Sequence, residues 1–432
     1  MKGIDMQKIQ HAHFIGVGGI GMSGLARLFL HEGKKVSGSD RTPTILTGML
    51  TLEGVTFYGA HSSDNIASDV DLVVYTEAMA QDNIELESAR ERGVVCINYF
   101  EALGLVANQY YLIAIAGSHG KTTTTAMLID IAEAAGFDPT AIVGSLRAST
   151  KTNYRAGKSK YFIVEACEYK RDFLTLEPDV LVITNLEYEH VDYYKNLADV
   201  QDAFRTLALC VPAEGAIICA ARDVNLAPVL AGVSAKVIDY HAYVDPLLTL
   251  QVPGMHNALN SAAARAAADF IGVKDGVARK ALSNFAGTWR RFEYKGELRG
   301  APVYDDYGHH PTEIRATVRG AREKYPGKRI LLAFQPHTYS RLHELFEDFA
   351  EALDEADEVY LAPAYAAREE NVYGTSSEKL AERARERGHK KVIAYASLED
   401  IAEALKVSTS GDSVILIMGA GDIPKLTAQL FA

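Results

Sequence analysis

The sequence contains only four cysteines, and their placement suggests neither a disulfide framework nor a zinc site. Cys96, Cys167, Cys210 and Cys219 are scattered through 432 residues, and none belongs to a C-x-x-C pair. Disulfide-rich domains and structural zinc sites bring their cysteines in closely spaced sets. The pattern therefore favours a protein of a reducing compartment.

A long hydrophobic run is also missing. No apolar segment reaches the roughly 20 residues that a transmembrane helix needs, and the N-terminus does not have the pattern of a signal peptide. Low-complexity segments and short internal repeats are not found either. We therefore expect no membrane insertion and a cytoplasmic location.

Positive charge is scarce as well. The formal net charge is −12, and no Lys/Arg-rich run stands out. Proteins that bind nucleic acids usually carry a basic patch, so the composition predicts no nucleic-acid partner. Small anionic substrates remain compatible with it, because single loops can be locally positive.

What is present indicates a globular chain with more than one domain. Hydrophobic residues make up 48% of the sequence and charged residues 23%, which is typical of globular proteins. A length of 432 residues exceeds one ordinary hydrophobic core, so two or three domains are expected. Strand-like and helix-like segments alternate and predict three consecutive α/β blocks.

The central block contains a phosphate-binding loop with a displaced first glycine. The usual pattern G-x-x-x-x-G-K-[ST] requires glycine where the chain has Ile115. The apolar run "YYLIAIAG" nevertheless predicts a strand before the loop, and "TTTTAMLIDIAEAAG" predicts a helix that ends near Gly136. An ordinary glycine turn does not explain the Lys-Thr pair at the helix start. The expected nucleotide contacts are Gly117, Ser118, His119, Gly120, Lys121, Thr122 and Thr123.

Within this loop, two residues have defined chemistry. Lys121 is expected to reach the β- and γ-phosphates of ATP, and Thr122 is expected to be a ligand of Mg²⁺. The helix that follows directs its positive end and its free N–H groups at an anion.

The first block opens with a second glycine-rich loop. Gly16, Gly18 and Gly21 have the spacing G-x-G-x-x-G between an apolar strand and an apolar helix, and a second strand ends at Asp40. A Rossmann-type fold places an acidic residue there against ribose hydroxyls. The pattern predicts a bound nucleotide or diphosphate without saying which one, so a nicotinamide cofactor stays open at this point.

Polar residues follow two further strands of the central block. Glu165 and Glu168 come after "KYFIV", and a second group follows "PDVLVIT". Because parallel strands end at the same edge of a sheet, these residues are expected to meet in the ligand crevice. A carboxylate and a histidine beside a P-loop suggest Mg²⁺ ligands. The second group consists of Asn185, Glu187, Glu189, His190 and Asp192.

The third block gathers acids, histidines and arginines. Tandem arginines precede the stretch "DDYGHHPTE", in which Pro311 is expected to start a helix. The spacing of the two acids and two histidines is not that of a zinc site. "KRILLAF" and "HELFEDFAEAL" predict a strand and a helix joined by a polar loop that presents His337 and Arg341.

Taken in order, these motifs resemble the Mur ligases of peptidoglycan synthesis, from "HFIGVGGIGMSGLA" to "MGAGDIPKL". The short loop "GSHGKTTTTAM" is similar to that family's form of the P-loop. The motifs "EACEY", "TNLEYEHVDYY", "GMHNALN", "RRFE", "DDYGHHPTE" and "FQPHTYSR" complete the series. The resemblance is strongest to the branch that adds L-alanine to UDP-N-acetylmuramate.

The resemblance implies an ATP-dependent ligase. ATP would phosphorylate the lactyl carboxylate of UDP-N-acetylmuramate, and the amine of L-alanine would attack the resulting acyl phosphate. Mg²⁺ is implied as the metal ion, with Mn²⁺ as the alternative. The resemblance also implies a cell-wall role and a monomer or weak homodimer.

It further implies three domains: residues 1–106, Rossmann-like and binding the UDP-sugar; residues 107–288, central and binding ATP; and residues 289–432, Rossmann-like and binding the amino acid. By resemblance, the UDP-sugar contacts are Gly16, Gly18, Gly19, Gly21, Asp40 and His61, and Asn185 lies in a substrate loop. The metal ligands are Thr122, Glu165 and His190.

The remaining implied residues concern the adenine, the nucleotide brought by the third domain, and the acceptor. His256 and Asn257 match adenine contacts, and Arg290, Arg291 and Asp306 match residues at the nucleotide, with Arg291 also counted among the substrate contacts. Acceptor-side residues are Tyr307, His309, His337 and Arg341. The implied catalytic set is Lys121, His190, His309, His337 and Arg341.

Two departures from the family pattern bear on these assignments. The stretch "DAFRTLALCVP" has no lysine where sister ligases carry a modified one near a second Mg²⁺, which agrees with the alanine-adding branch. Thr338 stands where some members have arginine. Three alternatives remain: a ligase that joins UDP-N-acetylmuramate to a tripeptide, a nicotinamide-dependent oxidoreductase, and an ATP-binding interaction module.

Overall fold

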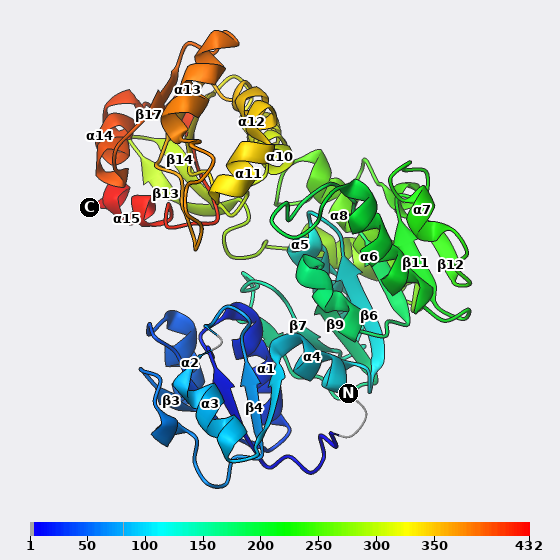
Figure 1. Ribbon diagram of the computed structural model, residues 1–432. Helices are drawn as coiled ribbons and strands as arrows, with labels where there is room; N and C mark the ends of the chain where they lie inside the picture. Colours follow the sequence, from blue (N-terminus) through cyan, green and yellow to red (C-terminus); the bar gives the residue numbers. More distant parts are fainter. Residues whose placement is uncertain (1–3, 81) are drawn as a thin grey trace. The chain divides into compact units, whose positions relative to one another are not determined.

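The computed structural model describes residues 4–80 and 82–432 (Figure 1). The chain forms two compact units. The first compact unit comprises the residues up to Leu186 together with Gln201–Tyr243 and Ala262–Leu282. The second compact unit comprises Glu187–Val200, Val244–Ser261 and Ser283–Ala432. Three sheets with flanking helices confirm the predicted three-domain α/β fold.

The first sheet is parallel throughout, in the order β3-β2-β1-β4-β5. Its strands are β1 (His11–Ile15), β2 (Lys35–Ser39), β3 (Thr56–Tyr58), β4 (Leu72–Tyr75) and β5 (Val95–Asn98). Its helices are α1 (Ile20–His31), α2 (Ile45–Glu53), η1 (Ser63–Asn65), α3 (Ile84–Glu91) and α4 (Tyr99–Ala107). Because chain order reverses at β1, the loop after β1 lies at the switch point where such sheets bind ligands.

The second sheet has seven strands in the order β12-β11-β10-β6-β9-β7-β8. Its strands are β6 (Tyr111–Ala116), β7 (Thr140–Ile142), β8 (Tyr154–Arg155), β9 (Tyr161–Glu165), β10 (Val180–Ile183), β11 (Ala216–Cys219) and β12 (Lys236–Asp239). The helices of this part of the chain are α5 (Lys121–Ala134), η2 (Tyr169–Thr175), α6 (Leu197–Leu209), α7 (Ala227–Leu230), η3 (Tyr240–Tyr243), α8 (Met255–Phe270) and α9 (Asp275–Ser283).

Strand β6, which carries the P-loop, lies between β10 and β9. Only β8 runs antiparallel to its neighbour. The central place of β6 explains why the sequence shows it as a continuous apolar run, since a strand covered on both faces has no polar side. It also brings the ends of β9 and β10 to either side of the P-loop, as predicted.

The third sheet has the order β13-β14-β18-β15-β16-β17, with β13 antiparallel to β14. Its strands are β13 (Glu293–Leu298), β14 (Ala301–Asp306), β15 (Arg329–Phe334), β16 (Glu358–Leu361), β17 (Val392–Ala394) and β18 (Ser413–Met418). Its helices are α10 (Pro311–Lys324), α11 (Tyr339–Glu344), α12 (Phe346–Leu353), α13 (Ser377–Glu386), α14 (Leu398–Ser408) and α15 (Lys425–Phe431).

Both faces of the third sheet are buried. On β15, Ile330, Leu332 and Phe334 enter one apolar core, which also contains residues of α10, α12 and α13. Leu331 and Ala333 point the other way, into a core built with α14 and α15. The alternation follows from the two-residue period of a strand.

The single helix predicted after strand β15 is interrupted. Leu345, with φ −108° and ψ 26°, separates α11 from α12.

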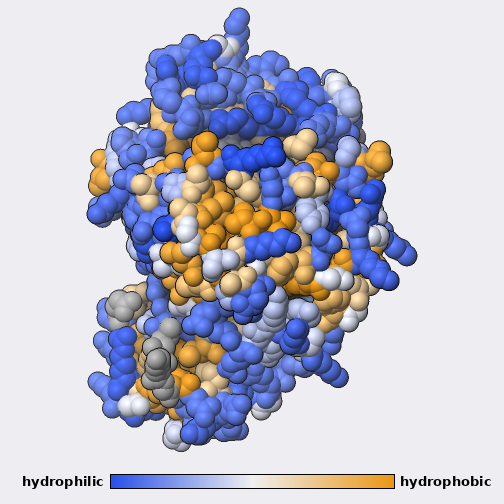
Figure 2. Space-filling view, turned by 90° about the vertical axis from the view of Figure 1, so that its right-hand side faces the viewer, coloured by the Kyte–Doolittle hydropathy of each residue, from blue (hydrophilic) through white to orange (hydrophobic). Residues whose placement is uncertain are grey.

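No helix in the described parts of the chain is long and apolar enough to span a membrane. On the face drawn in Figure 2, hydrophilic residues cover most of the surface, and hydrophobic residues reach it between them. All four cysteines are free thiols.

Candidate active site

The P-loop turns sharply because its two glycines adopt backbone conformations that other residues avoid. Gly117 has a φ of 133°, and a side chain there would come within 2.0 Å of Thr184 Oγ1. Gly120 has a φ of 81° and directly precedes α5. The predicted order of strand, loop and helix is confirmed, and Gly136 follows the C-terminus of α5 in the left-handed region, as expected of a helix stop.

Residues after β10 brace this loop. Asn185 accepts the His119 N–H at Oδ1 (2.9 Å) and donates from Nδ2 to the His119 carbonyl (3.0 Å). Its own carbonyl accepts the Ser118 N–H at 3.2 Å, and Thr184 Oγ1 donates to the His119 carbonyl. Asn185 therefore shapes the P-loop, and the substrate contact that the resemblance implies for it stays a prediction.

The N-terminus of α5 offers an anion site. No side chain of a described residue caps Gly120, and the first intrahelical bond runs from the Thr124 N–H to the Gly120 carbonyl. The N–H groups of the first helical turn normally need an outside acceptor. A phosphate group fits this need, because the helix dipole adds positive potential at the same place.

Lys121 forms a buried ion pair at this helix start. Its Nζ lies 2.9 Å from Glu168 Oε2, and the two side chains are 14% and 2% exposed. Burial disfavours the charged lysine, but the carboxylates of Glu168 and Glu165 outweigh this and raise the pKa of Lys121. The ammonium is therefore charged at neutral pH.

Thr122 and Glu165 provide oxygen atoms suited to a divalent cation. Thr122 Oγ1 donates to both carboxylate oxygens of Glu165, each at 2.9 Å, and Glu165 Oε2 also accepts the Gly144 N–H at 2.8 Å. Hard cations such as Mg²⁺ prefer carboxylate and hydroxyl oxygens. The donor set therefore fits the expected Mg²⁺.

The glycine loop of the first sheet is equally tight. Gly16 has a φ of 83°, and a side chain there would lie 2.4 Å from Thr76 Cγ2. The Gly18 N–H donates to Asp40 Oδ2 at 3.0 Å, so Asp40 holds the loop directly. Gly21 faces Tyr99, whose ring would lie 2.7 Å from a β-carbon at position 21. These contacts show a tight glycine turn after β1, with Asp40 hydrogen-bonded to it.

His61 is held by a buried carboxylate that the sequence did not single out. Its Nδ1 lies 3.0 Å from Glu85 Oε2 and 3.0 Å from Ser39 Oγ. Glu85 is fully buried, yet the nearby His13 and hydrogen bonds from Ser39 and Asn65 outweigh burial and lower its pKa to about 2. The carboxylate therefore stays charged and orients the His61 ring.

In the second compact unit, the loop after β14 is organised by arginines. Arg290 Nε lies 3.3 Å from Asp305, and the guanidinium carbons of Arg290 and Arg291 lie 5.1 and 5.2 Å from the centre of the Tyr307 ring. Asp306 accepts the N–H groups of Phe292 (2.9 Å) and Gly308 (2.7 Å). The two acids therefore have different partners: Asp305 pairs with Arg290, and Asp306 accepts backbone N–H groups.

Arg341 lies inside a cluster of titratable groups. Its Nε donates to Glu189 Oε1 at 2.8 Å, and its Nη1 donates to the His337 carbonyl at 3.1 Å. Burial opposes the charge on Glu189, but Arg341 and His190 hold the pKa of that carboxyl well below its usual range. Arg341 thus pairs with a buried residue, and not with Glu344 or Glu347 on the surface.

The two histidines of this cluster are neutral. Burial, reinforced by the positive charge of Arg341, lowers the pKa of His309 to about 3 and of His337 to about 4. The rings lie 5.9 Å apart, and His337 stacks on Tyr365 at 5.5 Å. Groups with such low pKa values are weak bases at neutral pH, so they are suited to orient an amine and not to take its proton.

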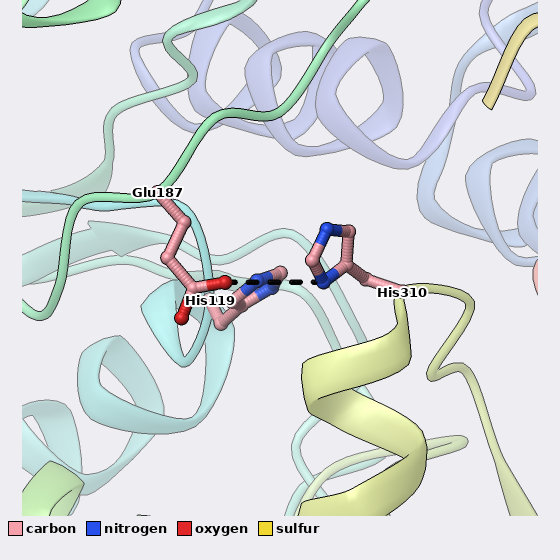
Figure 3. Close-up of side chains that lie close together, drawn as sticks. All are labelled: His119, Glu187 and His310. Carbon is pink, nitrogen blue, oxygen red and sulfur yellow. Dashed lines mark ion pairs between the residues drawn. The ribbon is translucent and has the colours of Figure 1, made fainter. Parts of the chain in front are cut away.

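Two further histidines stand at the start of helices in this unit: His310, and His256, which was predicted as an adenine contact. His310 caps α10 by accepting the Thr312 N–H at Nδ1 (3.3 Å), and that nitrogen lies 3.9 Å from Glu187 Oε2 (Figure 3). His256 stands in the first turn of α8, where burial lowers its pKa to about 4. Asn257 donates to the Pro253 carbonyl at 2.7 Å.

The sequence matches known proteins of one family along most of its length. Residues 11–111 match the catalytic domain of the Mur ligase family, residues 115–243 match the Mur ligase middle domain, and residues 290–421 match the glutamate ligase domain of Mur ligases. A UDP-N-acetylmuramate–L-alanine ligase from Agathobacter rectalis is 40% identical over 99% of both chains. The chain belongs to the Mur ligase family.

Solved structures of related Mur ligases agree with the fold. The UDP-N-acetylmuramate-alanine ligase of Thermotoga maritima has a TM-score of 0.80 at 28% identity, covering 98% of both chains. A murein peptide ligase from Psychrobacter arcticus has a TM-score of 0.73 at 26% identity, again covering 98% of both. The family and three-domain fold predicted from the motifs are thus confirmed.

The Mur ligase site residues fall into two sets. The P-loop, Glu165, Asn185, Asp40 and His61 belong to the first compact unit. His190 and the acceptor-side residues belong to the second, where His190 Nε2 lies 3.4 Å from Glu189 Oε2. The joint role of Glu165 and His190 as metal ligands, and the domain boundaries at residues 106 and 288, stay predictions.

Sequence reasoning left several residues at these sites without a role. Glu85, Glu168 and Glu189 each hold a side chain that was singled out, and all three are buried. Glu168 and Glu189 stand in quoted motifs, so proximity to a strand end was a usable signal for them. Glu85 lies in α3 amid ordinary charged residues and carried no such signal.

Proposed function

We propose that this Mur ligase uses ATP to join the lactyl carboxylate of UDP-N-acetylmuramate to the amine of L-alanine, in the synthesis of a peptidoglycan precursor. The observation that carries the proposal is the pairing of Thr122 with Glu165 beside Lys121 at the start of α5. This arrangement is that of an ATP site, and the chain is similar throughout its length to a ligase named for these two substrates.

The first step forms an acyl phosphate. A carboxylate oxygen attacks the γ-phosphorus, and the bond to the bridging oxygen of ADP breaks. Lys121 and the N–H groups at the start of α5 hold the phosphate oxygens, so that two anions can approach. Mg²⁺, held by Thr122 and Glu165, supplies further neutralisation of phosphate charge when bound.

The second step forms the amide. The amine nitrogen attacks the acyl carbon, the tetrahedral intermediate expels inorganic phosphate, and the nitrogen loses a proton to the departing phosphate or to water. Arg341 has the geometry to grip the amino-acid carboxylate, because its Nη2 forms no hydrogen bond to a described residue while Nε and Nη1 are fixed. Neutral His309 and His337 orient the amine.

The glycine loop after β1, together with Asp40 and His61, is proposed to hold the UDP-sugar. The proposed nucleotide contacts of the second compact unit are His256, Asn257, Arg290, Arg291 and Asp306, with Tyr307 on the acceptor side. ATP and nucleotide sugars are intracellular metabolites, which supports a cytoplasmic place of action. The monomer or weak homodimer stays a prediction.

Phosphate release from ATP tests the proposal. With UDP-N-acetylmuramate present, phosphate release is expected to be most efficient with L-alanine. Glycine should support it less well, since the missing methyl group is worth about 1–3 kcal/mol of discrimination, and L-serine, with its added hydroxyl, is tested beside it. The same assays are run with a peptidoglycan tripeptide in place of the amino acid. Hydride transfer is followed separately by the absorbance of an added nicotinamide cofactor. Preference for the tripeptide would favour the recycling activity, and hydride transfer would contradict the ligase.

Replacing Glu165 by glutamine tests the metal assignment. The substitution keeps the size of the side chain but removes the charge that Thr122 and Gly144 now contact. We expect Glu165→Gln to raise the Mg²⁺ concentration needed for half-maximal rate, and to slow turnover more than it weakens UDP-sugar binding. An unchanged Mg²⁺ titration would show that Glu165 is not a ligand.

A further inference from the structure

One loop of the central sheet contacts helix α1 of the first sheet, Glu165 and the P-loop helix α5. The loop from Gly144 to Asn153 joins β7 to β8, and both strands lie beside α1 (Figure 1). Helix α1 is the helix that begins at the glycine loop of the first sheet. The loop therefore spans from the ATP sheet to the proposed UDP-sugar site.

Asn153 makes the contact to α1. Its side chain is fully buried; its Nδ2 donates to the Ile20 carbonyl and to Ser23 Oγ (3.0 Å), and its Oδ1 accepts from Arg27 Nη1 at 2.6 Å. Ile20 is the first residue of α1, directly after the glycine loop. Asn153 thus binds the first turn of α1 and, through Arg27, its second turn.

The packing around this contact leaves little freedom. A β-carbon at Gly24 would lie 3.0 Å from Ile142 Cγ2 and 3.3 Å from Asn153 Nδ2. Helix α1 therefore approaches the hairpin of β7 and β8 as closely as glycine allows. Burying an amide without partners is costly, and here both the amide nitrogen and the amide oxygen of Asn153 are hydrogen-bonded to α1. The position of the glycine loop is therefore coupled to the position of the hairpin.

The other end of the loop is fixed to the ATP side. The Gly144 N–H donates to Glu165 Oε2, and a β-carbon at Gly144 would lie 2.4 Å from that oxygen. Arg147, which is buried, forms ion pairs with the partly exposed Asp130 (2.6 Å) and Glu133, both on the P-loop helix α5. The Val143 N–H donates to the Asn153 carbonyl at 3.0 Å and closes the loop on itself.

We propose that Asn153 is a positioning residue, which sets the first turn of α1 relative to Glu165 and thereby aims the carboxylate of the bound UDP-sugar at the γ-phosphate of ATP. The inference rests on the proposed function. Displacing a reacting group by about 1 Å can cost on the order of a hundredfold in rate, so a fixed distance between the two loops matters for catalysis.

Two variants of Asn153 separate positioning from folding. Asn153→Ala removes all its side-chain bonds. Asn153→Asp keeps the shape and the acceptor for Arg27 but cannot donate to Ile20 and Ser23. Asn108→Ala is the matched control, because Asn108 likewise donates to a carbonyl (Thr175, 3.0 Å) and accepts an N–H (Glu177, 2.9 Å), but at the far end of α4.

We expect both Asn153 variants to lower kcat/KM for UDP-N-acetylmuramate at least tenfold, with KM for ATP within twofold of wild type. Calorimetric titration with UDP-N-acetylmuramate alone should show weakened binding in both. Asn153→Asp should melt close to wild type, and Asn108→Ala should keep wild-type kinetics.

If Asn153→Asp restores wild-type kinetics, or if Asn108→Ala matches the Asn153 variants, Asn153 only stabilises the fold and the inference is wrong. A wild-type chain without UDP-N-acetylmuramate-dependent phosphate release would instead overturn the proposed function, and the inference with it.

Discussion

The Lys121→Ala variant is expected to lose about a hundredfold or more of its turnover at saturating ATP. Lys121 stands at the first position of α5, where the helix offers its N–H groups to a phosphate, and its pKa is raised, so it is charged. Removing one such electrostatic contact to a developing charge typically costs about 100- to 1,000-fold in rate. The measurement is steady-state phosphate release, with Lys160→Ala as control, since Lys160 packs on Tyr111 and Tyr161 before β9.

The contact of Lys121 with Glu168 changes one expectation. The sequence alone predicts that the charge of Lys121 contacts only phosphate, so that Lys121→Ala would leave the fold intact. In the structure, its removal breaks the ion pair with the buried carboxylate of Glu168. Breaking a buried pair typically costs about 3–5 kcal/mol of stability. Lys121→Ala is therefore expected to melt earlier than wild type.

A double variant separates the two effects. Lys121→Ala with Glu168→Gln removes both charges of the ion pair, so the melting temperature should return toward the wild-type value while turnover stays low. Recovery of turnover in the double variant would mean that Lys121 acts through the fold and not on phosphate.

The Arg341→Lys variant is expected to raise the KM for L-alanine at least tenfold and to leave the KM for ATP nearly unchanged. Lysine keeps the charge next to Glu189 but lacks the planar fork that holds a carboxylate at two points. Initial rates at varied L-alanine and varied ATP distinguish the two constants. Arg383→Lys is the control, because Arg383 forms an exposed pair with Glu347 in the same sheet domain.

An unchanged KM for L-alanine, together with a lower melting temperature, would give Arg341 a structural role. The buried Arg341–Glu189 pair would then be a scaffold, and the carboxylate-binding cation would have to be sought elsewhere. A change in the KM for ATP of similar size would also contradict the assignment, because it would indicate general distortion.

Local patterns predicted the elements of the site well. The apolar run before Gly117 predicted the buried strand β6, and the Lys-Thr pair after Gly120 predicted the start of α5. The same holds for Asp40, which directly follows β2 and meets the glycine loop from there. Such features depend on residues a few positions apart, so one sequence contains the information.

Pairs made across the fold were not predictable in this way. Asn153 meets Arg27 across 126 positions, and Arg341 meets Glu189 across 152. Neither contact has a periodicity or spacing that marks it, because it depends on how separate elements pack. The break at Leu345 is a similar case, since the apolar spacing of "LHELFEDFAEAL" alone predicts one continuous helix.

The acyl-phosphate route is tested most directly by isotope transfer. UDP-N-acetylmuramate labelled with ¹⁸O in its lactyl carboxylate is incubated with ATP, Mg²⁺ and L-alanine, and the released phosphate is analysed by mass. The account predicts that each phosphate carries one carboxylate oxygen, since the carboxylate attacks the γ-phosphorus and the amine later breaks the bond between carbon and that oxygen. Amide product accompanied by unlabelled phosphate would contradict it.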